Sequence, residues 1–311
     1  MKPDLVPAPF QFKPKSAGLV PRGLTLAAVI IIVLILAVIL LNVIQGGIGA
    51  ISWEFLTHAP ENGMEGGGIF PAIFGTVAMV LLMVIAVIPV GVLTAVYLHE
   101  YTQPDSMITR MIRVAINNLA GVPSIVFGLF GLGFFVEFIG SGLDSTFYHS
   151  ARPIWGQPAI IWASLTLALL TLPVVIVSTE EALRAIPREL KDASYALGAT
   201  KLQTIARVIV PQAMPGILTG AILGVSRGAG EVAPIMFTGA AYYLPHLPSS
   251  LHDQFMVLGY HVYVMATQSP DIEGTKPLLY GTVLVLLVLT LLLNTIAIVI
   301  RSRIRSRRAY A

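Results

Sequence analysis

Long apolar runs constrain this chain more than any other feature. A helix needs roughly 20 apolar residues to cross the hydrocarbon core of a bilayer, which is about 30 Å thick. The four clearest runs are residues 24–44, 70–98, 160–177 and 278–300. Two further stretches, at about residues 114–139 and 213–240, are long enough but rich in Gly, Pro, Asn and Ser. We therefore predict an all-α integral membrane protein with six transmembrane helices.

The composition excludes several classes of protein. Only 11% of the residues are charged and the mean hydropathy is +0.82, so polar groups cannot cover a soluble globule of this size. The absence of cysteine excludes a thiolate metal site, and the six histidines are scattered singly. No Gly-x-x-x-x-Gly-Lys-Ser/Thr loop is present for hydrolysing ATP. We expect a chain that is not an enzyme, with no catalytic residue, cofactor or metal of its own.

The lysines and arginines predict the orientation, because cytoplasmic segments of membrane proteins are enriched in both. With the N-terminus inside, the outer segments hold only Arg152 and Lys276, and Arg227 lies within a span. Both termini are then cytoplasmic. We interpret the basic tail as a positive-inside anchor beside membrane lipid, with no binding of nucleic acid. The predicted parts are an arm at 1–23, a first span at 24–44, a core with five spans at 70–300 and the tail at 301–311.

Small residues recur at every fourth position in the third and fifth spans. They are Ala120, Ser124 and Gly128 in the third span, and Gly216, Gly220, Gly224 and Gly228 in the fifth. Glycine weakens a helix, so this spacing indicates that another backbone approaches closely. The pattern fits plain helix packing, and it also fits helices that line or seal a pathway.

Arg227 and Glu231 lie one helical turn apart in the fifth span and are spaced to form an ion pair. An arginine in the hydrocarbon region costs about 3 kcal/mol on insertion scales, so it should face the protein, be paired or contact a polar ligand. Pro234 interrupts the backbone ladder nearby and allows a bend. Two interpretations stay open: a pair that only fixes packing, or an anion contact whose charge Glu231 balances when no substrate is bound.

The loop at residues 181–212 is predicted to be a pair of helices on the cytoplasmic side. Pro187 suits a first helical position, Gly198 suits a C-terminal cap, and Thr200 with Gln203 fits a capping box. Pro211 is expected to end the second helix. A short helix pair tethered between two spans is suited to docking a cytosolic partner.

The same loop carries a resemblance to a known family. Asp192, Ala193, Ser194, Gly198 and Pro211 match the Glu-Ala-Ala…Gly…Ile-x-Leu-Pro loop of ABC importer permeases, with Asp for Glu and Ser for the second Ala. Further segments, at residues 118–128, 177–187, 196–201 and 230–234, are similar to phosphate-importer permeases. The Gly-Glu-x-Ala-Pro ending resembles the PstA type more than the PstC type, although Val232 stands where Thr is common. The resemblance covers about residues 67–300.

This resemblance implies a type I ABC importer permease that moves inorganic phosphate across the inner membrane. Its loop would be a coupling helix that fits a groove in the ATPase. The implied partners are a PstC-like second permease, two PstB-like ATPase subunits that bind ATP and Mg, and a PstS-like phosphate-binding protein. The PstC-like subunit would pack on the glycine-striped helices. The substrate path would include Arg227, Glu231 and Ser124.

Three alternatives accompany this interpretation. The chain could be a permease for sulfate, molybdate or another oxyanion, since Arg227 alone does not discriminate among them. An ion-gradient-driven secondary transporter is less favoured, because the inverted repeats of many such folds are not visible. A non-transporting scaffold or sensor is disfavoured by the intramembrane ion pair and the structured loop.

Overall fold

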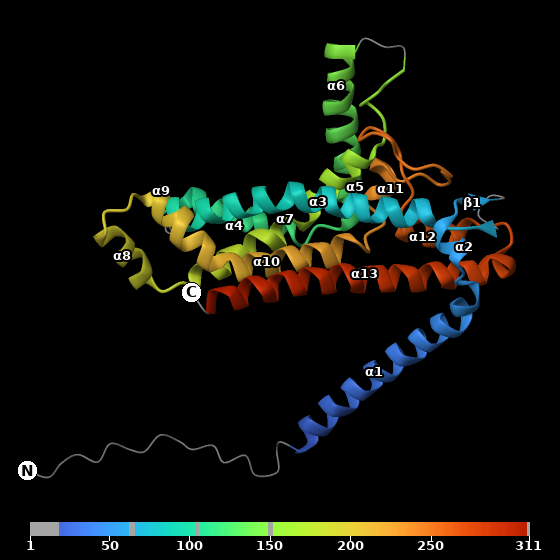
Figure 1. The fold of residues 1–311 in the computed structure, drawn as a ribbon, viewed down its shortest axis with the longest axis horizontal. Coiled ribbons are helices and arrows are strands. Elements are labelled where there is room, and N and C mark those ends of the chain that lie inside the picture. The colour runs from blue at the N-terminus through green and yellow to red at the C-terminus, as the bar shows by residue number, and fades with distance from the viewer. Residues whose placement is uncertain (1–18, 62–65, 104–105, 149–151, 310–311) are drawn as a thin grey trace, which may run out of the picture. The chain divides into compact units, whose positions relative to one another are not determined.

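The computed structural model describes residues 19–61, 66–103, 106–148 and 152–309, so most of the predicted arm and the last two residues of the tail lie outside it (Figure 1). The chain forms two compact units, Met1–Gln45 and Gly46–Ala311. Six helices within the described residues are long and apolar enough to cross a membrane, which confirms the predicted number. They are Pro21–Ala50, Phe70–Tyr101, Ser124–Tyr148, Ile160–Arg184, Lys201–Gly228 and Glu273–Ile304.

The described part of the first unit consists of helix α1 (Leu19–Gly47) up to Gln45. Its sequence is nearly pure Leu, Ile, Val and Ala from residue 24 to residue 41, and its large apolar side chains are exposed. A helix that is apolar all round is suited to lipid on every side.

Four long helices lie side by side in the second unit (Figure 1). They are α3 (Phe70–Val96), α7 (Ile160–Arg184), α10 (Val210–Gly228) and α13 (Ile272–Ala309). Helix α7 contacts both α3 and α10 and is the most buried of the spans. The buried clusters around α7 include one with Met83, Leu167 and Phe255, one with Leu98 and Ile176, and one with Val136 and Trp162.

Short elements mark the two ends of this bundle. At one end, the hairpin end, β1 (Pro60–Glu61) pairs antiparallel with β2 (Gly66–Gly67), close to η1 (Ile48–Ala50), α2 (Trp53–Thr57) and α12 (Leu258–Gln268). At the other end, the loop end, lie α8 (Arg188–Ala196) and α9 (Lys201–Thr204), and the C-terminal end of α13 lies at the same end of the bundle (Figure 1). The residues of the predicted cytoplasmic loop are therefore gathered at one end of the bundle.

The third span differs from its prediction at about residues 114–139. The chain instead forms α4 (Met107–Leu119), breaks, and begins a new helix at Ser124 that runs through α5 (Ser124–Gly131), η4 (Leu132–Gly140), α6 (Ser141–Leu143) and η5 (Asp144–Tyr148). Pro123 lacks an N–H and disfavours helical geometry at the preceding residue. Ala120 consequently lies outside the helix that holds Ser124 and Gly128, so these three residues do not form one helical stripe.

The fifth span also differs from its predicted bounds of 213–240. It begins at Lys201, continues through the π-helical turn η6 (Ile205–Ile209) into α10 and ends at Gly228. Pro211 does not end a helix. It follows η6 directly, inside the helical run from Lys201 to Gly228, and the irregular backbone of the π-helical turn accommodates its missing N–H. Pro234 precedes the separate short helix α11 (Ile235–Thr238), so it lies beyond the span instead of bending it.

Candidate functional site

Arg227 lies in the last turn of α10, about midway along the bundle. The adjacent Gly228 faces Met83, which lies near the middle of the span Phe70–Tyr101. The Nε atom of Arg227 is 3.5 Å from Oε1 of Glu231, and the two side chains are 38% and 22% exposed. The predicted pair is therefore present, although Glu231 lies beyond the helix end. The guanidinium of Arg227, midway along the bundle, is therefore partly accessible although it pairs with Glu231.

The start of α5 lies against the segment that follows Glu231. A side-chain carbon placed on Gly128 would lie 2.9 Å from the Cα atom of Pro234 and 3.0 Å from the carbonyl oxygen of Ala233. Ser124 is the first residue of α5, one turn before Gly128, and is half-buried. The fold thus brings the first turns of α5 and the segment after Arg227 and Glu231 into one region, although they are distant in sequence.

The glycine stripe of α10 packs against the chain's own helices. A carbon on Gly216 would meet Ala182 of α7, one on Gly220 would meet Ser178, and one on Gly224 would lie in ordinary contact with Val175. Gly228 faces Met83 of α3. The glycines of α10 therefore make their close approach to α7 and α3 of this chain, and the packing of a second permease on the glycine-striped helices stays a prediction.

The loop at residues 181–212 has the local structure that its sequence predicts. Gly198 adopts a φ of +80°, and the capping box of Thr200 and Gln203 forms. Pro187 lies at the N-cap position of α8, so this helix begins at Arg188, one residue later than predicted. The hydroxyls of Ser194 and Thr204 are 2.9 Å apart and join the two helices. The glycine and the caps therefore define a compact turn between α8 and α9.

The outer surface of this loop is exposed, and its inner surface contacts the end of the second span. Asp192, Ala193 and Gly198 are exposed, and so is the large apolar side chain of Leu197, at 89%. Lys191 forms an ion pair with Glu100, and the Nζ atom of Lys201 lies 4.5 Å from the centre of the Tyr101 ring. Neither Glu100 nor Tyr101 was predicted to contact the loop, because nothing local in the sequence links them to a segment so distant along the chain.

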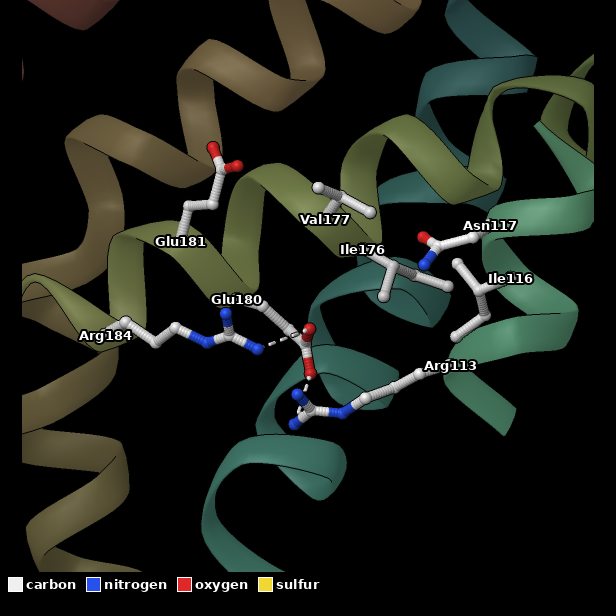
Figure 2. A pocket seen from close by; sticks show the side chains of 8 residues that line it. All are labelled: Arg113, Ile116, Asn117, Ile176, Val177, Glu180, Glu181 and Arg184. Carbon is white, nitrogen blue, oxygen red and sulfur yellow. Dashed lines mark ion pairs between the residues drawn. The ribbon is translucent and has the colours of Figure 1, made fainter. Parts of the chain in front are cut away.

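A cavity of about 240 Å³ lies between α4 and α7 toward the loop end (Figure 2). Glu180 projects into this region from α7, and its carboxylate lies between two arginines, 3.2 Å from Arg113 of α4 and 3.5 Å from Arg184. The Glu180 residue is only 8% exposed. Glu181 points away from this pair (Figure 2). A buried carboxylate needs such cationic partners to stay charged, and the sequence alone did not reveal them.

Among the described histidines, His261 is the most deeply buried, and it lies at the hairpin end. Its side chain lies on α12, which is outside the six membrane-length helices, and the residue is 3% exposed. No partner for its Nδ1 atom exists among the described residues. Burial lowers the pKa of the His261 imidazole to about 4. His261 is therefore held neutral, as a core residue.

Known proteins agree with this architecture. Residues 87–310 match the family described as "Binding-protein-dependent transport system inner membrane component". A Bacillus subtilis protein named "Probable ABC transporter permease protein YqgI" is 34% identical over 258 residues, covering 78% of this chain and 82% of the relative. The "Phosphate transport system permease protein PstA 1" of Mycobacterium tuberculosis (strain CDC 1551 / Oshkosh) is 34% identical over 242 residues, covering 78% and 73%.

Two further similarities extend this relation. The "Probable phosphate transport system permease protein PstA" of Methanocaldococcus jannaschii is 32% identical over 253 residues, covering 81% of this chain and 82% of the relative. A chain of a bacterial ABC transporter "involved in the import of the acidic polysaccharide alginate" has the same fold, with a TM-score of 0.67, 14% identity and coverage of 91% and 95%. The predicted fold class is confirmed. The chain belongs to the family of inner-membrane components of binding-protein-dependent transport systems, as a multi-pass ABC importer permease.

Proposed function

We propose that this chain is the permease subunit of an ATP-driven importer that moves inorganic phosphate into the cytoplasm. The observation that carries the proposal is Arg227, a cation midway along the bundle that keeps an accessible face beside Glu231. Relatives named as PstA phosphate permeases, each more than 30% identical to this chain, support phosphate as the substrate.

The chemistry of this region suits an oxyanion. A guanidinium presents N–H donors in a planar fork that matches phosphate oxygens. Ser124 begins the third span, and the start of a helix favours negative charge. Glu231 balances Arg227 when the path is empty and gives way when the anion arrives. Phosphate would then pass between the start of α5 and the end of α10.

The loop at residues 181–212 serves as the coupling element in this proposal. Its exposed surface, with Asp192, Ala193 and Leu197, docks on an ATPase subunit that binds ATP and Mg. Ser194 and Gly198 shape the turn behind this surface. This chain itself hydrolyses nothing and binds no cofactor. The complex would comprise this chain, a PstC-like permease, two PstB-like ATPase subunits and a PstS-like phosphate-binding protein.

The same proposal places the chain in the inner membrane. The concentration of Lys and Arg on the side of the 181–212 loop puts both termini in the cytoplasm. The arm at 1–23 and the tail at 301–311 then lie on that side, before the first span and after the permease core at 70–300. The hairpin end faces outward, toward the binding protein.

Uptake of labelled phosphate tests the substrate. Cells that lack only this gene should lose high-affinity phosphate uptake, and a plasmid copy should restore it in the presence of excess sulfate and molybdate. A defect in sulfate or molybdate uptake, with phosphate uptake unchanged, would keep the permease architecture and overturn the substrate.

Variants of Arg227 test the substrate contact. A hydrogen bond to a charged group contributes about 1.5–3 kcal/mol, so Arg227→Met should slow uptake roughly 10- to 100-fold without loss of assembly. Lys276→Met is the matched control, because it removes an exposed cation that pairs with an exposed glutamate outside this region. Normal uptake by the Arg227→Met complex would show that Arg227 only fixes packing.

A further inference from the structure

Glu180 is a buried charge that the proposed substrate path does not use. It lies on α7 toward the loop end, where its carboxylate pairs with Arg113 of α4 and with Arg184 one turn further along α7. Arg184 is 54% exposed, whereas Arg113 is 32% exposed. An ion pair is screened less where it is less exposed to water, so the pair with Arg113 is the stronger link.

This ion pair bridges a gap between α4 and α7. The cavity of about 240 Å³ lies beside it, and Ile116 and Asn117 of α4 line one wall (Figure 2). Much of the apolar surface of α4 faces away from the body, since Met107 and Met111 are 77% and 61% exposed. Helix α4 is therefore held to α7 by charge at a place where side-chain packing is incomplete.

Arg113 also connects α4 to the end of the second span. Its Nη2 atom donates a hydrogen bond to the carbonyl oxygen of Leu98, at 3.3 Å. Two residues further on, Glu100 in η3 (Tyr97–Tyr101) pairs with Lys191 of α8. The Oε1 atom of Glu100 also lies 3.6 Å from Nε2 of His99. The segment around η3 is thus contacted by α4 on one side and by the coupling loop on the other.

The far end of α4 leads directly to the proposed path. The helix ends at Leu119, and after four residues Ser124 begins α5. Helix α4 moves as a rigid body, so its displacement moves the four residues that join it to Ser124 and alters their φ and ψ. Motion at the 181–212 loop therefore has a physical route to Ser124.

Resting on the proposed function, we propose that Glu180 is a positioning residue that couples the ATPase to the path. The pairs Lys191–Glu100 and Arg113–Glu180, joined through η3, make α4 follow the coupling loop. Two buried atoms at this junction, Nε of Arg113 and Oγ1 of Thr179, have no hydrogen-bond partner among the described residues, and Oε1 of Glu180 is held by its ion pair with Arg113 without a well-aligned hydrogen bond. A network selected for stability alone would satisfy these atoms, whereas one that exchanges partners between two arrangements leaves some unsatisfied in each.

The test uses the complete importer in proteoliposomes, with phosphate uptake and ATP hydrolysis measured on the same preparation. Glu180→Gln keeps the size of the side chain and removes its charge. It should lower the phosphate transported per ATP by roughly fivefold or more, while ATP hydrolysis stays within about twofold of the parent. Glu181→Gln is the matched control, because Glu181 lines the same cavity but has no ion pair in the described part of the chain, and its ratio should equal that of the parent.

A charge exchange keeps the inference testable if Glu180→Gln fails to assemble. Glu100→Lys and Lys191→Glu should each lower the ratio, and the double variant should restore it. An unchanged ratio in Glu180→Gln, or a double variant as poorly coupled as the single ones, would overturn the inference. If the parent carries another oxyanion, the same ratio is measured with that anion, so failure of the phosphate proposal and failure of the coupling proposal are distinguishable.

Discussion

Replacing Gly216 with alanine measures how closely α10 approaches α7. A Cβ atom on Gly216 would lie 2.2 Å from the Cβ atom of Ala182 and 3.3 Å from its Cα atom. Non-bonded carbons are most stable about 3.5–4.0 Å apart, so the helices must separate. Ala182 cannot relieve the overlap by rotation, because its Cβ is fixed to the backbone. Gly224 provides the contrast, since a Cβ there would lie 3.7 Å from Val175, in ordinary contact.

Two opposing effects determine the expected magnitude. Overpacking a close contact costs about 1–3 kcal/mol. Alanine is more favourable than glycine inside a helix by about 0.5–1 kcal/mol. Gly216→Ala should therefore lower the free energy of unfolding by about 1–2 kcal/mol, whereas Gly224→Ala should leave it unchanged or raise it by up to about 1 kcal/mol.

Unfolding of the purified permease in mixed detergent micelles, followed by circular dichroism during a dodecyl sulfate titration, measures this difference. The parent, Gly216→Ala and Gly224→Ala are compared under identical conditions. The reasoning is refuted if both variants unfold at the same detergent composition, or if Gly216→Ala is as stable as the parent. Either outcome would mean that α7 and α10 are further apart than the structure describes.

Two remaining predictions concern the loop end and the hairpin end. Gly198 has a φ of +80° with open space around it, so Gly198→Val is strained by its backbone alone, by about 1–2 kcal/mol. Co-purification of the ATPase with the permease should fall in Gly198→Val and persist in Gly198→Asn, since asparagine tolerates this conformation; equal recovery would contradict the coupling role. Burial holds the pKa of His261 at about 4 in the folded permease, below its ordinary value of 6.5. As the pH falls from 6.5 to 4, the unfolded chain binds a proton at this histidine and the folded permease does not, so the free energy of unfolding decreases. The loss approaches about 3 kcal/mol, and His261→Leu should remove it from the pH profile of unfolding; parallel profiles for parent and variant would exclude this origin.

Local sequence signals predicted local structure well. The capping box of Thr200 and Gln203 and the left-handed turn at Gly198 both form. Each depends on residues within one or two turns of each other, so a short stretch of sequence specifies them. The number of spans followed in the same way, from the length of apolar runs.

The limits of the spans were predicted less well. Hydropathy over a window does not locate a break, and the chain breaks at residues 120–123, inside the run predicted at about 114–139, before the third span begins at Ser124. Proline was also ambiguous. Pro123 precedes a helix start, whereas Pro211 lies inside a helical run, directly after the π-helical turn η6.

The apolar runs, the capping residues and the charges within the spans already show that this chain crosses a membrane and where its loop forms. Which groups meet depends on how the helices pack. The glycine stripe predicted a close approach but not that α7 makes it, and neither Glu180–Arg113 nor Lys191–Glu100 is encoded by any local spacing. The physical reason is that helix periodicity places a residue on a face, whereas the packing of distant helices selects the partner of that face.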